Sequence, residues 1–453
     1  MPGSQAYTDS LESYFSMRET SVQPACIVSP TSSIDVSIAV KSLTLLGCDF
    51  AIRSGGHAMW PGIANIAGGV TLDLSDLSTV QVSKDKSTVS VAPGARWGDV
   101  FAVLDAHSLA ALGGRVSTVG VGGLTLGGGI SAFSPRYGFT CDTVKNFEVV
   151  LASGAIVQAN AKQNRDLFYA LRGASNNFGV VTRIDLEAFP QGPFWGGGTN
   201  HDIATTPQQL KAAADLASAS PYDEFASLVQ TYTYIAGLGS FVSNTMHYTK
   251  TASDQEVPAF FKPFTDIPNT GSTLRVGNLS SFGAEGAAGS PHGYRASLAE
   301  ITVGDSLEVL TAAVDAWNKS IASLQSVSGL MYQLLLEPIP EGAYKRAAPG
   351  TNSLGLEGAR GGLTVVGVAV GWTDAVDDAL VEQTSKQVVA DIEHEAKRLG
   401  QYNKFVYLNY ASPWQKVIES YGAESVAKLK KVSKRYDPKG VFQKRVPGGF
   451  KLP

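Results

Sequence analysis

A short strand-like run, Cys48–Ile52, ends in the segment Arg53-Ser54-Gly55-Gly56-His57. Two adjacent glycines directly after a strand let the backbone turn sharply, and they bring its N–H groups close enough to hold an anion. A histidine after such a turn is usually an ordinary polar loop residue. The segment therefore requires a fold in which a strand ends beside open space or a bound group, and other motifs must decide the role of His57.

Further glycine-rich and aromatic segments follow in order along the chain. They are Val119–Gly129, Asn164–Gly173, Asn176–Thr182, Tyr407–Tyr410 and Tyr436-Asp437-Pro438. The chain has 48 glycines, and their clustering in such segments suggests close backbone approach to a large ligand. In this order and spacing, the segments resemble the berberine-bridge-enzyme-like flavoproteins of the vanillyl-alcohol-oxidase superfamily, particularly the fungal members. The resemblance runs from about Pro24 to Leu452 and is weak in the middle of the chain.

Length and strand pattern indicate an α+β protein of two domains. A chain of 453 residues exceeds one ordinary core,. Up to Pro190 the pattern predicts a parallel βαβ start with an antiparallel continuation. The expected strands there are Ala25–Val28, Phe50–Arg53, Val70–Asp73, Thr88–Val91, Phe147–Leu151 and Gly179–Glu187.

The middle section is expected to form an antiparallel sheet with one face covered by helices. Its expected strands are Phe225–Tyr234, Ser240–Lys250, Leu330–Glu337 and Gly362–Gly371, and its expected helices are Pro207–Ala219, Ser253–Phe261, Ser306–Val327 and Ala375–Arg398. A strand, Phe405–Tyr410, and two helices, Trp414–Tyr421 and Ala423–Tyr436, should follow.

The resemblance implies a function for each of these parts of the chain. It implies the two-domain PCMH-type FAD-binding fold, in which residues 1–195 and 405–453 hold FAD. Residues 196–404 would form the substrate-binding domain, with the antiparallel sheet and its helices. In the family, the C-terminal segment returns to the cofactor domain and closes over the flavin.

Composition and missing motifs exclude several function classes. A net charge of −4 without a basic run argues against nucleic acid as a partner,. No apolar run approaches the length of a membrane span,. The six histidines lack zinc spacing, so we expect no metal site,. A Rossmann glycine motif and a nucleophile elbow are also missing, which disfavours nicotinamide dehydrogenases and serine hydrolases.

The cysteines leave one question open. Cys26 and Cys48 each lie at the start of a predicted strand, and one helical segment separates the strands. In a βαβ unit the two strand starts could lie side by side within disulfide reach. Two free thiols are an equally good interpretation.

The resemblance implies that FAD lies along the glycine-rich segments. In the family, the histidine at the position of His57 forms a covalent bond to the flavin's 8α carbon. Such alkylation makes the flavin a stronger hydride acceptor, and we expect covalent FAD on His57. The full set of implied cofactor-binding residues is Arg53, Ser54, Gly55, Gly56, His57, Val119, Gly120, Gly122, Gly123, Gly128, Val180 and Asn409.

Two valines bear on the attachment of the flavin and on its reaction with oxygen. Many relatives add a second bond from a cysteine at the position of Val116. Valine cannot form a thioether, so we expect no cysteinyl link. In the family, the residue at the position of Val119 gates oxygen access, and valine there goes with oxidases.

The candidate catalytic residues come from the tail and the middle strands. Asn409 and Tyr410 resemble the family's Asn-Tyr pair at the flavin, and Tyr410 is a candidate base if its surroundings lower its pKa,. The family often has aspartate where this chain has Ser412, so a substrate-lining role for Tyr410 stays open. Tyr332 and Glu337 are further candidates, because strand alternation aims some side chains at the flavin.

These features together predict an FAD-dependent oxidase. Hydride would pass from a small secondary-metabolite alcohol, amine or phenol to flavin N5, and O2 would reoxidise the flavin to give H2O2. The alternative is a non-redox cyclase that uses FAD largely as a scaffold, as some family members do. Fungal relatives generally carry a signal peptide, so we expect a secreted or vesicular protein whose leader is absent from this sequence. We also expect a monomer.

Overall fold

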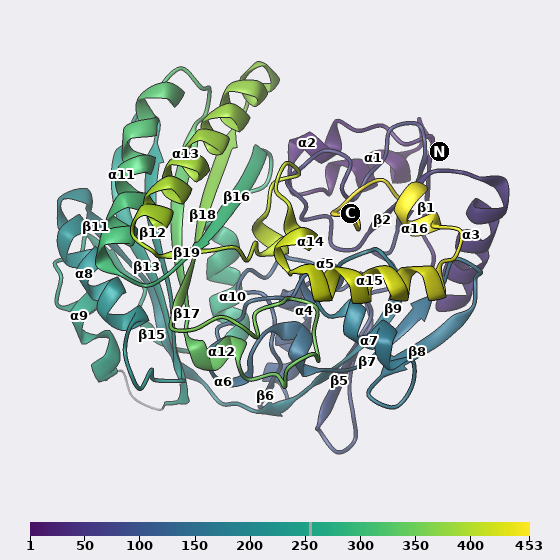
Figure 1. The fold of residues 1–453 in the computed structure, drawn as a ribbon, viewed down its shortest axis with the longest axis horizontal. Helices are drawn as coiled ribbons and strands as arrows, with labels where there is room; N and C mark the ends of the chain where they lie inside the picture. Colours follow the sequence, from purple (N-terminus) through teal and green to yellow (C-terminus); the bar gives the residue numbers. More distant parts are fainter. Residues whose placement is uncertain (253–255) are drawn as a thin grey trace.

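The computed structural model describes residues 1–252 and 256–453, which form two regions built around separate sheets (Figure 1). The first region contains both ends of the chain, drawn in purple and yellow, and the second contains the long antiparallel sheet. No helix in the described part of the chain is long and apolar enough to cross a membrane.

The chain enters the first region through a small parallel sheet. Its strands are β1 (Cys26–Val28), β2 (Phe50–Arg53) and β3 (Val70–Asp73), in the order β1-β3-β2. Helix α3 (Ser33–Leu46) connects β1 to β2. The Ser32 side chain accepts the Asp35 N–H at the start of α3, and Gly47 ends the helix with φ of 68°, as capping preferences require.

The strand order decides the state of the two cysteines. Because β3 lies between β1 and β2, Cys26 and Cys48 belong to segments separated by a whole strand. Neighbouring strands are about 4.8 Å apart, so a strand in between puts these cysteines beyond disulfide reach. Both are free thiols, and the disulfide alternative is wrong.

A five-stranded antiparallel sheet completes the first region. Its order is β4 (Val80–Val82), β5 (Thr88–Val91), β9 (Val180–Glu187), β7 (Val144–Val150) and β8 (Ile156–Asn160). Strands β6 (Leu109–Ala110) and β10 (Phe189–Pro190) form a separate pair. The helices of this region are α1 (Gln5–Glu12), α2 (Met17–Thr20), α4 (Trp97–Asp105), α5 (Val121–Leu126), α6 (Ser134–Tyr137) and α7 (Arg165–Leu171).

The second region is built on a nine-stranded sheet. Its order is β14 (Gly271–Ser272), β11 (Phe194–Asp202), β13 (Gly239–Thr251), β12 (Ala226–Ile235), β17 (Met331–Ile339), β18 (Leu363–Trp372), β16 (Arg295–Val303) and β19 (Tyr402–Asn403). Strand β15 (Arg275–Gly277) also pairs with β11.

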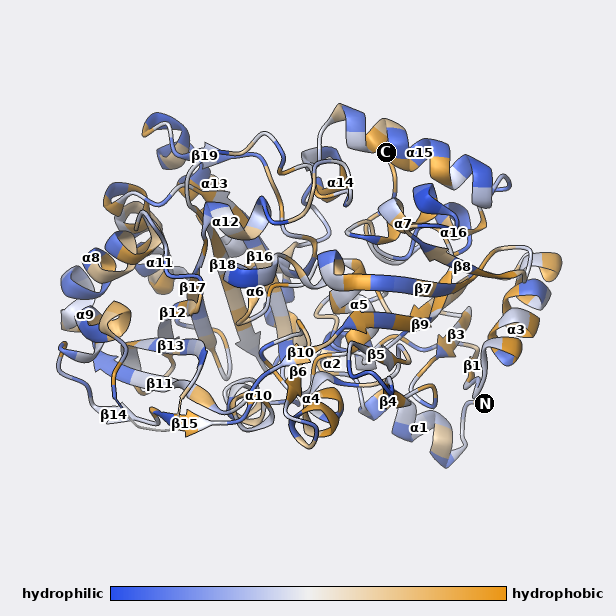
Figure 2. Ribbon diagram, turned by 90° about the horizontal axis from the view of Figure 1, so that it is seen from below, coloured by the Kyte–Doolittle hydropathy of each residue, from blue (hydrophilic) through white to orange (hydrophobic). Residues whose placement is uncertain are grey.

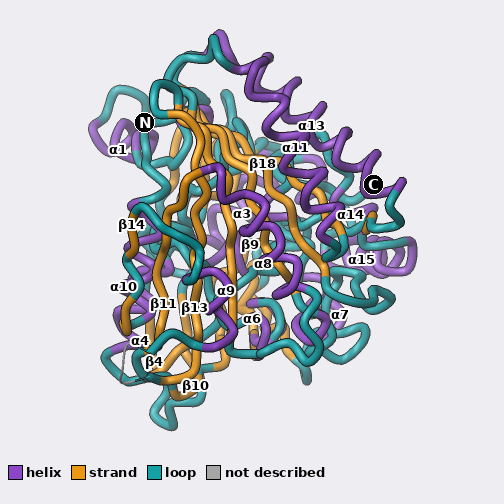
Figure 3. Tube along the Cα trace, turned by 90° about the vertical axis from the view of Figure 1, so that its left-hand side faces the viewer, coloured by secondary structure: helices purple, strands orange, loops and turns teal. Residues whose placement is uncertain are grey.

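Helices cover one face of this large sheet. Helix α8 (Thr206–Ala217), α11 (Leu307–Leu324) and α13 (Asp378–Arg398) share one hydrophobic cluster with the strands, and Figure 3 shows α11 and α13 lying along the same side. Shorter helices are α9 (Lys262–Thr265), α10 (Leu279–Ala288) and α12 (Glu341–Tyr344). The start of the predicted helix Ser253–Phe261 lies outside the described residues, and its end forms a 3₁₀ turn, Ala259–Phe261. The fold is thus of the expected α+β class, with an antiparallel sheet covered by helices on one face.

The C-terminal segment packs back onto the first region. Helices α14 (Val417–Ser420), α15 (Ala423–Tyr436) and α16 (Val441–Lys444) lie beside the N-terminal elements in Figure 1. Helix α15 alternates hydrophobic and hydrophilic residues (Figure 2) and buries Leu429 and Val432. The Phe50 N–H donates to the Arg445 carbonyl at 2.7 Å, which joins strand β2 to this segment.

The predicted strand Phe405–Tyr410 does not form. Its end is a 3₁₀ turn, Leu408–Tyr410, and the Tyr407 N–H donates to the side chain of Glu300 at 2.5 Å instead of to a neighbouring strand. The Glu300 side chain therefore accepts the hydrogen bond that a neighbouring strand would accept in a sheet.

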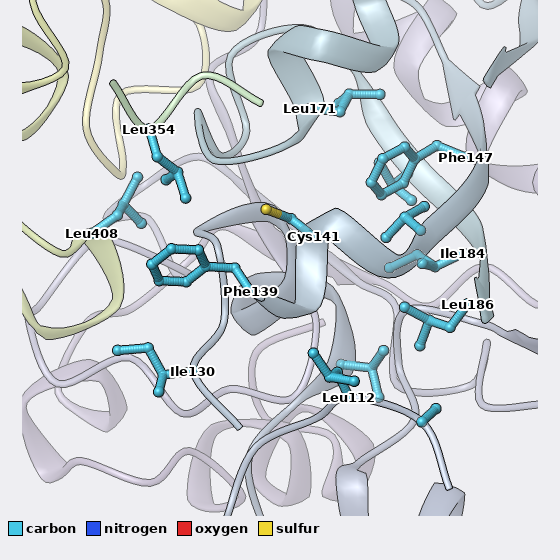
Figure 4. Packing of buried hydrophobic residues seen from close by; sticks show 14 of the residues in the cluster. Leu112, Ile130, Phe139, Cys141, Phe147, Leu171, Ile184, Leu186, Leu354 and Leu408 are labelled. Carbon is cyan, nitrogen blue, oxygen red and sulfur yellow. The ribbon is translucent and has the colours of Figure 1, made fainter. Parts of the chain in front are cut away.

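One hydrophobic cluster crosses the boundary between the regions. In Figure 4, Leu354 and Leu408 pack toward Phe139 and Ile130. These residues come from segments more than two hundred positions apart. The two regions therefore share a core, which fixes the walls of the cavity between them.

Candidate active site

A cavity of about 450 Å³ lies between the two regions, within the usual size range of ligand sites. Its walls come from four places: the loop around Ser54–Trp60, the segment Gly114–Leu126, the cavity-facing side of β16–β18 and the tail Tyr407–Ala411. Most of these side chains are apolar. Asn176, Gly179, Val180, Val181 and Phe450 also line the cavity.

Two glycine loops touch to form one wall of the cavity. A Cβ on Gly55 would lie 2.4 Å from the Gly120 Cα, and a Cβ on Gly120 would lie 2.5 Å from the Gly55 nitrogen. Both distances are far below any real contact, so each position accepts only glycine. A Cβ on Gly122 would in turn lie 2.8 Å from Ser54 Oγ. A ligand in the cavity therefore meets bare backbone here, as a phosphate group requires.

The shape and donors of the cavity fit FAD. The bare backbone of Gly55, Gly56 and Gly120 lines it and would hold a pyrophosphate. His57, Val119 and Val180 line the same cavity. Gly123 leaves open space where its Cβ would be. FAD needs this combination of bare backbone and mostly apolar walls.

His57 lies on the cavity wall in a tightly defined position. Its ring stacks on Phe15, with 4.0 Å between centroids and 14° between planes. Its Nε2 lies 3.2 Å from Thr118 Oγ1. Burial, with a smaller contribution from His292, lowers the pKa of His57 to about 3. The imidazole is therefore neutral at physiological pH, the form that can act as a nucleophile.

Arg53 and Gly128 do not line the cavity, which corrects two predicted cofactor contacts. The Arg53 side chain is buried on the opposite side of its strand, in an ion pair with Asp73 at 3.1 Å. It also donates to the Ser10 carbonyl at 2.6 Å. Gly128 has φ of 108° and packs beneath Tyr407 and Leu354. The sequence motif placed both residues near the cofactor but could not give their direction.

Three charged or polar side chains meet at the end of the cavity nearest the large sheet. Arg115 Nη1 lies 2.5 Å from Glu337 Oε1, and Arg115 Nη2 donates to Tyr410 Oη at 2.9 Å. Tyr410 Oη donates to Glu337 Oε2 at 3.1 Å. Arg115 and Tyr410 line the cavity, whereas the side chain of Glu337 is only 1% exposed. We call these three residues the proton cluster.

The charges of the proton cluster are set by its burial. Burial and the nearby Glu337 carboxylate raise the pKa of Tyr410 well above its usual range, and Arg115 offsets only part of this effect. Burial lowers the pKa of Arg115, but Glu337 and then Tyr410 more than compensate and raise it overall. The cluster therefore holds an ion pair between Arg115 and Glu337, together with a neutral phenol.

Tyr332 points away from the site, which corrects its prediction as a catalytic residue. Its ring is fully buried beside Trp317 under the helical layer, and its hydroxyl lies 2.8 Å from Ser320 Oγ. On strand β17 the cavity-facing side chains are Met331, Gln333 and Leu335. Successive side chains of a strand point to opposite faces, so Glu337 points to the same face as these three residues and Tyr332 points to the other.

Asn409 supports the tail under the site. Its Nδ2 donates to the Leu124 carbonyl at 3.0 Å and to Tyr407 Oη at 3.1 Å. Tyr407 Oη also accepts the Ile130 N–H at 2.9 Å. These bonds tie the tail that carries Tyr410 to the glycine-rich segment.

Arg115 is the site residue that the sequence interpretation missed. It follows the apolar run Leu109–Leu112 and the pair Gly113-Gly114. This order of apolar strand, two glycines and polar residue is the one that singled out His57. The same signal could therefore have found Arg115.

Among residues 1–252 and 256–453, no group of three or more His, Cys, Asp or Glu side chains is placed to hold a metal ion.

Comparison with known proteins identifies the family. Residues 24–160 match the family model described as FAD binding domain. The chain is 39% identical to FAD-dependent monooxygenase CTB5 from Cercospora beticola, covering 100% of this chain and 88% of the relative. It is 40% identical to oligopeptidase PhomG' from Diaporthe leptostromiformis over 464 residues, but spans only 36% of that protein.

Solved structures share the fold. 6-Hydroxy-D-nicotine oxidase from Arthrobacter nicotinovorans superimposes with a TM-score of 0.82 at 21% identity, covering 100% of this chain and 96% of that one. BBE-like 1 from Physcomitrella patens gives a TM-score of 0.79 at 20% identity, with coverage of 100% and 96%. The resemblance drawn from the sequence motifs is confirmed: the chain belongs to the family of FAD-linked oxidoreductases that includes the fungal FAD-dependent monooxygenase CTB5, and it shares the fold of the berberine-bridge-enzyme-like proteins.

Proposed function

We propose that this chain is an FAD-dependent oxidase whose flavin is attached to His57 by a single covalent bond, and whose proton cluster takes the proton of a small apolar substrate. The observation that carries the proposal is the contact of Arg115, Glu337 and Tyr410 at the end of a cavity that fits FAD. Bound FAD would supply the hydride acceptor, and O2 would take the electrons onward to give H2O2.

The tether follows from the position of His57. Its neutral ring lies on the cavity wall, and nucleophilic attachment needs a free nitrogen lone pair. Val116 also lines the cavity and has no sulfur, so no second bond forms there.

The proton cluster suits a substrate hydroxyl. Because the pKa of Tyr410 is raised, its phenol cannot be the base in ionised form. It can instead accept the substrate's proton while it passes its own proton to Glu337, to which it is hydrogen-bonded. Arg115 stabilises the phenolic oxygen during this transfer. Such positioned proton transfer contributes about 10²- to 10⁴-fold to a rate.

The walls of the cavity restrict the substrate. Strands β16–β18 present Leu298, Met331, Leu335 and Ala369, with Ser297 and Gln333 as polar residues among these neighbours. The carboxylate that reaches this end, Glu337, is already paired with Arg115. An oligosaccharide would lose hydrogen bonds against such walls, which favours a small phenol or alcohol with an apolar body.

Anaerobic mixing tests the proposal. The full-length protein should be titrated with a panel of phenols and benzylic alcohols while flavin absorbance is recorded. We expect at least one compound to bleach the flavin, and air should restore the colour with release of H2O2. Tyr410→Phe should slow bleaching by about 10²- to 10⁴-fold. Product formation without bleaching, unchanged in Tyr410→Phe, would contradict the oxidase and favour a non-redox cyclase.

A further inference from the structure

Three small residues follow one another on the cavity-facing side of strand β18. The valines between them belong to the hydrophobic cluster under the helices, so these residues point to the opposite face of the sheet. They are Gly367, Ala369 and Gly371, and the last two line the cavity. A Cβ on Gly371 would meet Met331 Cε first, at an ordinary contact distance of 3.6 Å. The floor of the cavity along β18 is therefore flat.

Longer side chains stand on both sides of this floor. Leu298 on β16 is paired with Ala369, and Gln333 on β17 is paired with the same residue from the other side. Neighbouring strands are about 4.8 Å apart, so Leu298 and Gln333 stand roughly 10 Å apart across the floor. A flat ring system can lie on the floor between them with all its atoms in contact, whereas a puckered ring would touch it with few atoms and gain less dispersion energy.

Gln333 brings an unpartnered acceptor to this floor. Its side chain lines the cavity and is half-buried. Its Nε2 donates to Thr233 Oγ1 at 3.3 Å, which fixes one end of the amide. Within residues 1–252 and 256–453, no hydrogen bond reaches the amide oxygen, Oε1. A ligand that covers Gln333 must therefore donate to this oxygen, because an amide that is buried without a partner is costly.

The same strand sets the distance from Gln333 to the proton cluster. Gln333 and Glu337 are four residues apart on one face of β17, which corresponds to about 14 Å of strand. Their side chains stand roughly perpendicular to the sheet, and Leu335, midway between them, lines the cavity. Tyr410 Oη, 3.1 Å from Glu337 Oε2, marks the end at which the substrate's hydroxyl reacts. Allowing a hydrogen bond of about 2.8 Å at each end leaves about 8 Å between two substrate oxygens.

This span selects the length of the substrate. A one-ring diol is too short for it, whereas a two-ring diol with hydroxyls at its opposite ends matches it. We propose that Gln333 is a specificity-determining residue, and that the substrate is a flat phenol with two fused rings along its length and a second hydrogen-bond donor at its far end. The reacting hydroxyl lies at Tyr410, the rings lie on Ala369 and Gly371, and the far donor binds Gln333 Oε1. The inference rests on the proposed oxidase function, and it names the class of substrate for that site.

Binding of a matched pair of naphthols tests the role of Gln333. 2,6-Dihydroxynaphthalene carries a hydroxyl at each end, and 2-hydroxynaphthalene has the same rings but only one hydroxyl. Isothermal titration calorimetry should be run under nitrogen on the full-length holoenzyme, kept reduced with dithionite so that no turnover accompanies binding. We expect the diol to bind wild type about tenfold more tightly, the factor set by one hydrogen bond of ordinary strength. In Gln333→Leu, which nearly keeps the volume but has no acceptor, this preference should disappear.

Two further variants separate the hydrogen bond from the shape of the floor. Met331→Leu changes a neighbouring cavity residue whose side chain is apolar, so the tenfold preference for the diol should remain. Ala369→Leu raises a branched side chain from the floor and should weaken binding of both naphthols by about tenfold or more. Equal affinity of wild type for the two naphthols, or an undiminished preference in Gln333→Leu, would overturn the inference. So would unchanged affinities in Ala369→Leu.

The proposed oxidase function can fail separately from this inference. If phenols and benzylic alcohols never bleach the flavin but the diol still binds through Gln333, the oxidase proposal fails and the binding role of Gln333 stands. If a substrate bleaches the flavin while wild type and Gln333→Leu bind the two naphthols alike, the oxidase proposal stands and the inference fails.

Discussion

Replacing Glu337 by glutamine removes one charge from the proton cluster and nearly preserves volume. In the folded protein the side chain of Glu337 is 1% exposed and that of Arg115 is 14% exposed. Breaking a buried ion pair typically costs about 3–5 kcal/mol, because the remaining charge is left uncompensated. The glutamine oxygen can still accept a hydrogen bond, so we expect the lower end, a loss of about 3 kcal/mol in the free energy of unfolding.

Urea unfolding of the full-length protein, followed by circular dichroism, measures this loss. Glu224→Gln is the matched control: Glu224 pairs with Arg346 at 2.9 Å, but the two side chains are 53% and 47% exposed. Exposed pairs contribute about 0–1 kcal/mol, so the control should unfold almost as wild type does. If Glu337→Gln is destabilised no more than Glu224→Gln, the reasoning from a buried pair is refuted.

Three further variants probe other parts of the structure. Val119→Leu should slow reoxidation in air of dithionite-reduced protein without slowing its anaerobic reduction, and stopped-flow absorbance separates the two steps. Gly55→Ala should destabilise the protein by about 1–3 kcal/mol, because its Cβ would lie 2.4 Å from the Gly120 Cα; Gly123→Ala, with open space around it, should weaken FAD binding but leave unfolding unchanged. Burial raises the pKa of Glu300 from 4.5 to about 8, so the folded state binds its proton more tightly than the unfolded state. The stability that this tighter proton binding contributes is therefore complete below about pH 4.5 and is lost as the pH rises to about 8. In Glu300→Gln the urea midpoint should vary less with pH across that window, and an unchanged pH profile would contradict this.

Local sequence patterns predicted those elements whose signals are local. Strands β2, β3 and β5 have the bounds expected from apolar runs between turn residues. The same reasoning failed for Phe405–Tyr410, because the buried side chain of Glu300, from a distant strand, accepts the backbone N–H of Tyr407 there.

The site was predictable in part for a similar reason. Glycine motifs placed His57 and Gly120 on the cavity, since the motifs describe a backbone shape. Alternation along a strand gave two possible faces, and nothing in the sequence showed that Tyr332 would face the helices. The partnership of Arg115, Glu337 and Tyr410 depends on packing between segments up to 295 positions apart, which no local pattern encodes.

The positions of the wall residues in the sequence also determine when the cavity can form during synthesis. Ser54–His57 lie on the same cavity as Gly449 and Phe450. At about 5–20 residues per second, the ribosome makes the first of these segments roughly 20–80 s before the second. Until then the cavity beside the glycine loops lacks the wall that Gly449 and Phe450 form. The complete cofactor site thus forms late in synthesis. A chain that holds its flavin has therefore folded from its first segments to its last.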